Sequence, residues 1–137
     1  MPSPSDITDP GLRQALEDAD RMLNDGDYAA ASRTCADAYL VLLERHPELI
    51  PANTGVIAPG AYQPRPSGSG GENPLSTFGN ARATRAGFWP VTGSIQVLVD
   101  EDRKPRLHFS KDRFSFSEAA GYYEFVMNEV WRLQQAG

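Results

Sequence analysis

Hydrophobic side chains recur at helical spacing through residues 9–50, in two stretches separated by a glycine. Asp9 suits the N-cap of the first stretch, and Pro10 suits the first helical position, where its missing N–H costs nothing. Gly26 follows the stretch and suits the left-handed residue that often ends a helix. The pattern therefore predicts a first helix whose apolar stripe consists of Leu12, Leu16, Ala19 and Leu23.

A second helix is predicted directly after Gly26. Asp27 can cap its start, and Pro47 prevents it from continuing. Two helices joined by so short a turn must lie antiparallel, so residues 9–50 predict a helical hairpin. One face of the second helix carries Tyr28, Ala31, Cys35, Ala38, Leu42 and Leu43.

Small residues at the turn and along both helices allow the two helices to pack closely. Ala19, Gly26, Tyr28, Ala31 and Ala38 occur at the spacing found in a tetratricopeptide repeat, and residues 12–45 resemble a single unit of that family. The resemblance implies a helical hairpin that binds another protein. A generic helical hairpin that serves only as core is the alternative. No second copy of the unit follows in the sequence.

Residues 51–92 interrupt this regular pattern with prolines at 51, 59, 64, 66, 74 and 90 and a glycine-serine run at 67–71. Neither helical nor strand periodicity is sustained, so we expect a long loop. Residues 64–74 are expected to be its most mobile part. The glycine run lacks the lysine and hydroxyl residue of a phosphate-binding loop, which favours a linker.

Alternating hydrophobic residues after Gly93 predict a β-hairpin or meander over residues 93–116. Ile95, Val97 and Val99 share one predicted face, and a charged turn separates them from the next strand. Phe114 with Phe116 is expected to add a third short strand.

A helix over residues 117–135 is predicted to complete the chain. Ser115 or Ser117 can cap it, and the spacing of Ser115 to Glu118 fits a capping box. Its apolar surface is wider than one stripe, so we expect it to touch two layers, either within the chain or in a homodimer. Its apolar residues are Ala119, Tyr122, Tyr123, Phe125, Val126, Met127, Val130, Trp131 and Leu133.

Together these elements predict one α+β domain spanning residues 1–137. It consists of an N-terminal antiparallel helical hairpin, a long loop rich in proline and glycine, a small antiparallel sheet of two to three strands, and a C-terminal helix. A chain of 137 residues, 40% of them hydrophobic, suits one core.

The charge distribution argues against wholesale nucleic-acid binding. Residues 1–50 hold four arginines against ten acids, and residues 51–92 hold three arginines against one acid. The acidic helical part repels phosphate backbones. Cys35 is the only cysteine, so it cannot form an internal disulfide, and we expect it to be packed in the core. With no signal-like start or bilayer-length apolar run, we expect a cytoplasmic protein with no membrane association.

Arg82 and Arg85 stand close to Phe88 and Trp89, which is the composition of a recognition hot spot. Guanidinium groups bind carboxylates or phosphates, and flat rings bury area at low entropic cost. We predict that these four residues contact a partner or ligand. The alternative is that both aromatic residues enter the core while the arginines solvate a turn.

A second candidate, for anion contact, consists of Arg103, Arg106 and His108 on the predicted hairpin. His108 falls on the polar face of its strand, where we expect it to be exposed. The acidic run at residues 100–102 is followed at once by basic residues, which predicts a solvated turn with local charge compensation. A β-ribbon could instead contact nucleic acid through five basic residues, Arg103, Lys104, Arg106, Lys111 and Arg113.

We identify no catalytic residues, no metal ligands and no cofactor motif in the sequence. It therefore predicts a small interaction or regulatory module without catalytic chemistry of its own, with a protein partner. A small-molecule site for an anionic or aromatic ligand, closed by residues 51–92, is the alternative. Nucleic-acid contact ranks below both. An enzyme stays an open alternative, because acids that are distant in the sequence can come together in the folded chain.

Overall fold

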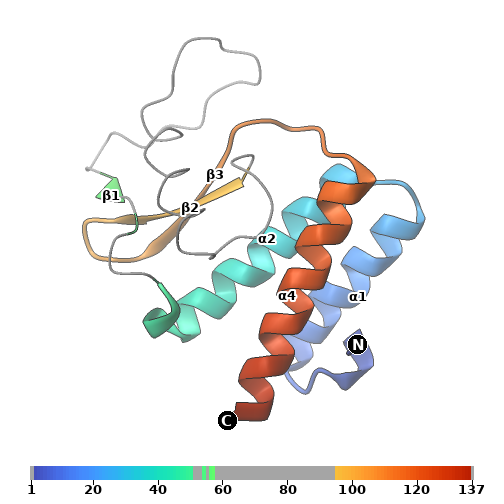
Figure 1. Cartoon of the computed structure of the whole chain (residues 1–137), viewed down its shortest axis with the longest axis horizontal. Coiled ribbons are helices and arrows are strands. Elements are labelled where there is room, and N and C mark those ends of the chain that lie inside the picture. Colours follow the sequence, from blue (N-terminus) through green and yellow to red (C-terminus); the bar gives the residue numbers. More distant parts are fainter. Residues whose placement is uncertain (1, 51–53, 55, 58–94, 137) are drawn as a thin grey trace. The chain divides into compact units, whose positions relative to one another are not determined.

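The structure, a computed structural model, describes residues 2–50, 54, 56–57 and 95–136. The helical hairpin, the antiparallel strand pair and the C-terminal helix are all present, which confirms the predicted α+β class (Figure 1). Two compact units are formed, one from Met1–Leu42 with Arg113–Gly137 and the other from Leu43–Asp112. The elements are η1 (Pro4–Asp6), α1 (Pro10–Asn24), α2 (Tyr28–Arg45), η2 (Pro47–Leu49), β1 (Val56–Ile57), β2 (Ile95–Asp100), β3 (Pro105–Phe109) and α4 (Phe116–Ala136).

The residues predicted to cap both ends of α1 and the start of α2 are the ones that do so in the structure. Asp9 Oδ1 accepts a hydrogen bond from the Leu12 amide at 2.9 Å, with Pro10 as the first helical residue. Gly26 adopts φ 80°, the left-handed conformation that glycine reaches without strain. Asp27 Oδ1 then accepts from the Ala30 amide at 3.3 Å. The left-handed glycine and a local side-chain cap therefore form the turn of the hairpin.

The core of the helical unit comes from all three helices. Tyr39 of α2 packs edge-on against Phe125 of α4, with ring centroids 5.2 Å apart. In α4, Tyr122 is fully buried and meets Phe114 edge-on at 6.1 Å. The other buried members include Leu12, Leu16, Ala19, Ala31, Cys35, Ala38, Val126, Met127 and Val130. The buried residues of α4 thus contribute to the core of this unit.

The segment before α1 is attached to the helices by polar side chains. Arg13 Nε donates to the carbonyl of Ile7 at 2.8 Å, and its guanidinium also donates to the carbonyl of Thr8 at 3.3 Å. Ile7 itself is buried. The arginine thereby satisfies carbonyls that precede the helix while the isoleucine adds to the core.

The sheet has the strand order β1-β2-β3. β2 and β3 pair antiparallel, with Gln96 opposite His108. The third strand is β1, which pairs parallel with β2 and places Val56 opposite Val99. The expectation of a third strand at Phe114 and Phe116 was wrong, because Phe114 lies in the core and Phe116 begins α4.

β1 also corrects the expectation of an unbroken loop over residues 51–92. It lies within that segment, and pairing with the distant β2 satisfies backbone groups that local periodicity does not reveal. The segment predicted to be most mobile, residues 64–74, lies outside the described residues.

α4 begins with the predicted capping box. The Glu118 amide donates to Ser115 Oγ at 3.1 Å, and the Ser115 amide donates to Glu118 Oε1 at 2.9 Å. Ser115 is therefore the cap, and the helix covers Phe116–Ala136, one residue more at each end than predicted. Among the described residues, no helix is both long and apolar enough to span a bilayer.

Candidate interaction surface

The predicted hot spot of Arg82, Arg85, Phe88 and Trp89 lies outside the described residues. Partner or ligand contact by these four side chains stays a prediction.

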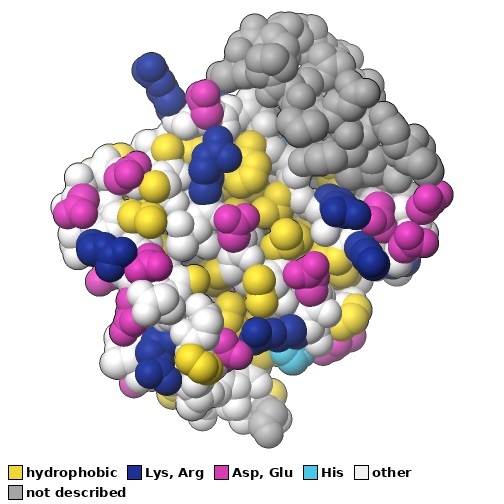
Figure 2. Space-filling view, turned by 180° about the vertical axis from the view of Figure 1, so that it is seen from behind, with side chains coloured by type: hydrophobic (Ala, Val, Ile, Leu, Met, Phe, Trp, Pro, Cys, Tyr) yellow, Lys and Arg dark blue, Asp and Glu magenta, His cyan; other side chains and the backbone are white. Residues whose placement is uncertain are grey.

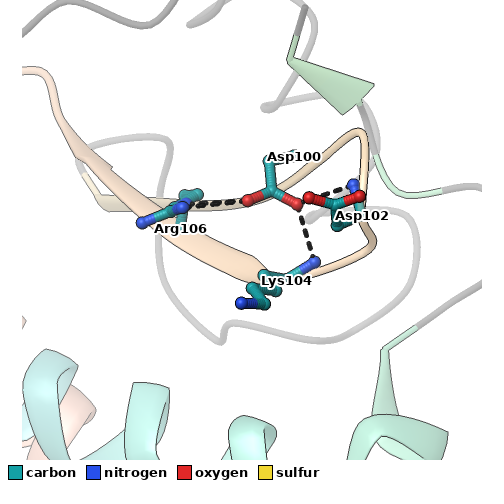
Figure 3. Close-up of polar contacts among 4 residues, drawn as sticks. All are labelled: Asp100, Asp102, Lys104 and Arg106. Carbon is teal, nitrogen blue, oxygen red and sulfur yellow. Dashed lines mark hydrogen bonds and ion pairs between the residues drawn. The ribbon is translucent and has the colours of Figure 1, made fainter. Parts of the chain in front are cut away.

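Asp100 organises the turn between β2 and β3 (Figure 3). Its Oδ1 accepts from the amides of Asp102 at 2.9 Å and Lys104 at 3.0 Å. Its Oδ2 accepts from Arg106, whose Nη2 lies 2.9 Å away. The Lys104 amide, and then Arg106 and the Asp102 amide, hold the pKa of Asp100 below its usual value. The predicted charge compensation within the turn is confirmed by this ion pair.

The three residues predicted to contact an anion stand in different surroundings. Arg106 is exposed but already paired with Asp100. Arg103, also exposed, holds a left-handed conformation in the turn, with φ 64°. The expectation that His108 is exposed was wrong, since only 2% of its surface is accessible. The alternation of β3 did place it on the face of Arg106, but β2 is buried on both faces, and its residue opposite His108, Gln96, is buried too.

The one thiol of the helical unit, that of Cys35, lies in the core. Cys35 is fully buried, as predicted, and burial raises the pKa of its thiol to about 12. Among the described residues, no group of three or more histidine, cysteine or acidic side chains could hold a metal ion. The buried thiol therefore serves as a small core residue.

An aromatic pair, Tyr28 and Phe116, joins the first residues of α2 and α4. We call this pair the aromatic edge. The ring centroids are 5.6 Å apart with an interplanar angle of 70°, an edge-to-face contact. Phe116 remains 55% exposed, while Tyr28 is half-buried. Phe116 is the most exposed large hydrophobic residue in the described chain, with Val41 next at 36%.

Sequence reasoning missed the aromatic edge because it assigned Phe116 to a strand. The capping box contained a usable signal, since a cap at Ser115 makes Phe116 the first helical residue. Placing Phe116 in the helix would have removed it from the predicted strand. Its contact with Tyr28, 88 positions earlier in the numbering, could not have been inferred locally.

The surroundings of the aromatic edge are acidic. Asp25 and Asp27 stand exposed in the turn directly before Tyr28, and Glu118 lies in the first turn of α4. Residues 1–42 and 113–137 together hold eleven acids against five arginines, a net charge of −6. Figure 2 shows one face of the molecule, on which hydrophobic side chains reach the surface between charged ones.

Comparisons with known proteins find no matching family model and no significantly similar curated protein or solved structure. The resemblance of residues 12–45 to a tetratricopeptide repeat thus stays a prediction.

Proposed function

We propose that the chain acts in the cytoplasm as a protein-interaction module that binds a partner through the aromatic edge. The single observation that carries this proposal is the exposure of Phe116, 55% of whose surface stays accessible although its ring packs against Tyr28. Aromatic residues, phenylalanine included, are enriched in protein interfaces relative to the rest of the surface.

The contact with Tyr28 supports the proposal because it limits the freedom of the exposed ring. A ring already held against a neighbour loses less conformational entropy when a partner covers it. Covering the exposed part of Phe116 would contribute about 1–2 kcal/mol. Such a contribution is useful only within a larger interface, so the partner is expected to be a protein.

Photo-crosslinking tests this proposal at the level of one side chain. In the full chain, p-benzoylphenylalanine replaces Phe116, and a second protein carries it in place of Val41, the other exposed large hydrophobic residue. We expect position 116 to capture one protein in cells that naturally make the chain, and position 41 to capture none.

Competition makes the result specific. Excess unlabelled wild-type chain should suppress capture at position 116, whereas excess Phe116→Ala should not. Thermal unfolding establishes that each variant is folded. If the whole chain retains a stoichiometric partner that position 116 never captures, or if Phe116→Ala competes as well as wild type, the aromatic edge is not the binding surface.

A further inference from the structure

We infer that the aromatic edge takes a cationic segment of a partner protein, one that presents an apolar residue flanked by lysines or arginines. This inference rests on the proposed function and adds the chemistry of the partner. The apolar residue would cover Phe116, and the basic groups would face the acids that precede Tyr28.

The charges close to the aromatic edge are mainly negative. Asp25 and Asp27 are exposed, and Glu118 follows Phe116 by two positions. Arg113 is the nearest cation before Phe116 in the same unit. Arg21, in the last turn of α1, already pairs with Asp18 at 2.8 Å. Within three positions of Tyr28 or Phe116 along the chain there are thus three acids and one arginine, Arg113, which gives the edge a negative net charge.

The helix dipoles do not reverse this sign. The starts of α2 and α4 each carry a partial positive charge of roughly half a unit. Asp27 caps the first, and the Ser115–Glu118 box caps the second. The C-terminal end of α1, which precedes Asp25, adds a partial negative charge. The full charges on the exposed carboxylates therefore dominate.

Other occupants would meet like charge. In a symmetric dimer through this edge, the acidic turn of one copy would face that of the other, which costs free energy. Nucleic acid and anionic lipid surfaces are repelled for the same reason. A basic protein segment gains both the apolar contact and charge complementarity.

The test uses the full chain and three fluorescent peptides of about four helical turns. The first has one face of leucine and phenylalanine flanked by lysines. The second has glutamates in place of the lysines, and the third scrambles the first peptide so that its apolar residues are dispersed. Fluorescence anisotropy measures binding of each peptide at low and at high salt.

Two double variants separate the acids of the edge from acids elsewhere. Asp25→Asn with Asp27→Ser removes two charges near Tyr28, and the serine keeps the helix cap. Glu17→Gln with Glu124→Gln removes two exposed charges that lie eight positions from Asp25 and Phe116 along their helices. Eight positions correspond to about 12 Å along a helix.

We expect only the first peptide to bind. Phe116→Ala should weaken it about tenfold, and the Asp25/Asp27 variant about three- to tenfold at low salt, with less effect at high salt. The Glu17/Glu124 variant should bind like wild type. Equal binding of the scrambled peptide, or equal weakening by both double variants, would show non-specific attraction and overturn the inference.

Failure of this inference can be told apart from failure of the proposed function. If position 116 crosslinks to a natural partner but the glutamate peptide binds better than the lysine peptide, the surface is correct and the partner chemistry is wrong. The inference is also overturned if no peptide binds while crosslinking at position 116 succeeds. If position 116 captures nothing while the chain retains a partner elsewhere, both fail together.

Discussion

Gln134 and Thr8 are joined by two hydrogen bonds although 126 positions separate them in the sequence. The Thr8 amide and hydroxyl both donate to Gln134 Oε1, at 2.8 and 3.1 Å. Gln134 Nε2 donates in turn to the carbonyl of Asp6 at 2.8 Å. One side-chain amide near the end of α4 therefore holds the backbone on both sides of the buried Ile7.

Gln134→Ala should destabilise the chain by about 1–2 kcal/mol, because it removes three hydrogen bonds and frees the segment before α1. Gln135→Ala is the matched control, since Gln135 is exposed and both substitutions change helix propensity equally. Urea unfolding measures the difference. Hydrogen exchange at the Thr8 amide should accelerate in Gln134→Ala but not in Gln135→Ala. If both variants lose the same stability, the loss comes from the end of the helix and not from the bonds to Thr8 and Asp6.

Ser115→Ala should cost about 1 kcal/mol of stability, because Ser115 Oγ caps the Glu118 amide. Ser117→Ala, two residues later in the first turn of α4, should change stability by less than about 0.5 kcal/mol. Urea unfolding of the two variants shows which of the two serines that the sequence offered as a cap, Ser115 or Ser117, stabilises the start of α4. A larger loss from Ser117→Ala would contradict the observed capping box.

Arg103→Gly should stabilise the turn by about 0.5–1 kcal/mol. Arg103 holds φ 64°, a conformation that is strained for a residue with a Cβ and free for glycine. Lys104→Gly, at the next position, relieves no such strain and should destabilise through the entropy of the unfolded chain. Chemical unfolding compares the two. If both glycines destabilise equally, backbone strain at Arg103 does not limit stability.

Asp100 should make the chain less stable in acid. Its pKa is lowered in the folded state by the Lys104 amide first, and also by Arg106 and the Asp102 amide. The stability it contributes is therefore present above the unfolded pKa and is lost as the pH falls through the lower folded pKa. Asp100→Asn should lose this part of the acid dependence.

Unfolding measured across the acid range tests the role of Asp100, with Glu101→Gln as the control at the exposed neighbouring position. The wild type and Glu101→Gln should lose stability in parallel as the pH falls, and Asp100→Asn should fall less steeply. A direct NMR titration of the Asp100 carboxyl should give a pKa below 3.8, the ordinary value. A value above it would contradict the hydrogen-bonded turn.

Cys35 should react with thiol reagents only when the chain opens. Burial raises the pKa of its thiol to about 12, so the thiolate is scarce at pH 8, and the side chain is inaccessible in the folded unit. A disulfide reagent should label it slowly under native conditions and rapidly in guanidinium chloride. Because it is the only cysteine, the absorbance reports a single site. Fast native labelling would contradict its place in the core.

The secondary structure of the helical part could be predicted because its determinants are local. Asp9, Gly26 and Ser115 act on amides and carbonyls within a few residues, so the sequence contains both the cap and the group that it caps. The charged turn could also be anticipated, since Asp100 and Arg106 lie close together along the chain.

The candidate surface depended on contacts between distant residues. Phe116 could be placed in a helix from its cap, but its exposure and its contact with Tyr28 follow from how α2 and α4 meet. The hot spot at residues 82–89, the clearest candidate in the sequence, lies outside the described residues. Composition could suggest candidate surface residues, but it could not show which of them the folded chain buries.

The sequence by itself determined the three long helices to within a few residues, the turn between the first two, and the hairpin of β2 and β3. Tertiary structure alone decided that β1 joins the sheet in parallel, that His108 is buried, and that Gln134 reaches Thr8. The physical reason is the separation along the chain of the groups that interact. Helix caps and turns are satisfied within a few residues, whereas burial and long-range pairing depend on which distant segments come together to exclude water and satisfy backbone groups.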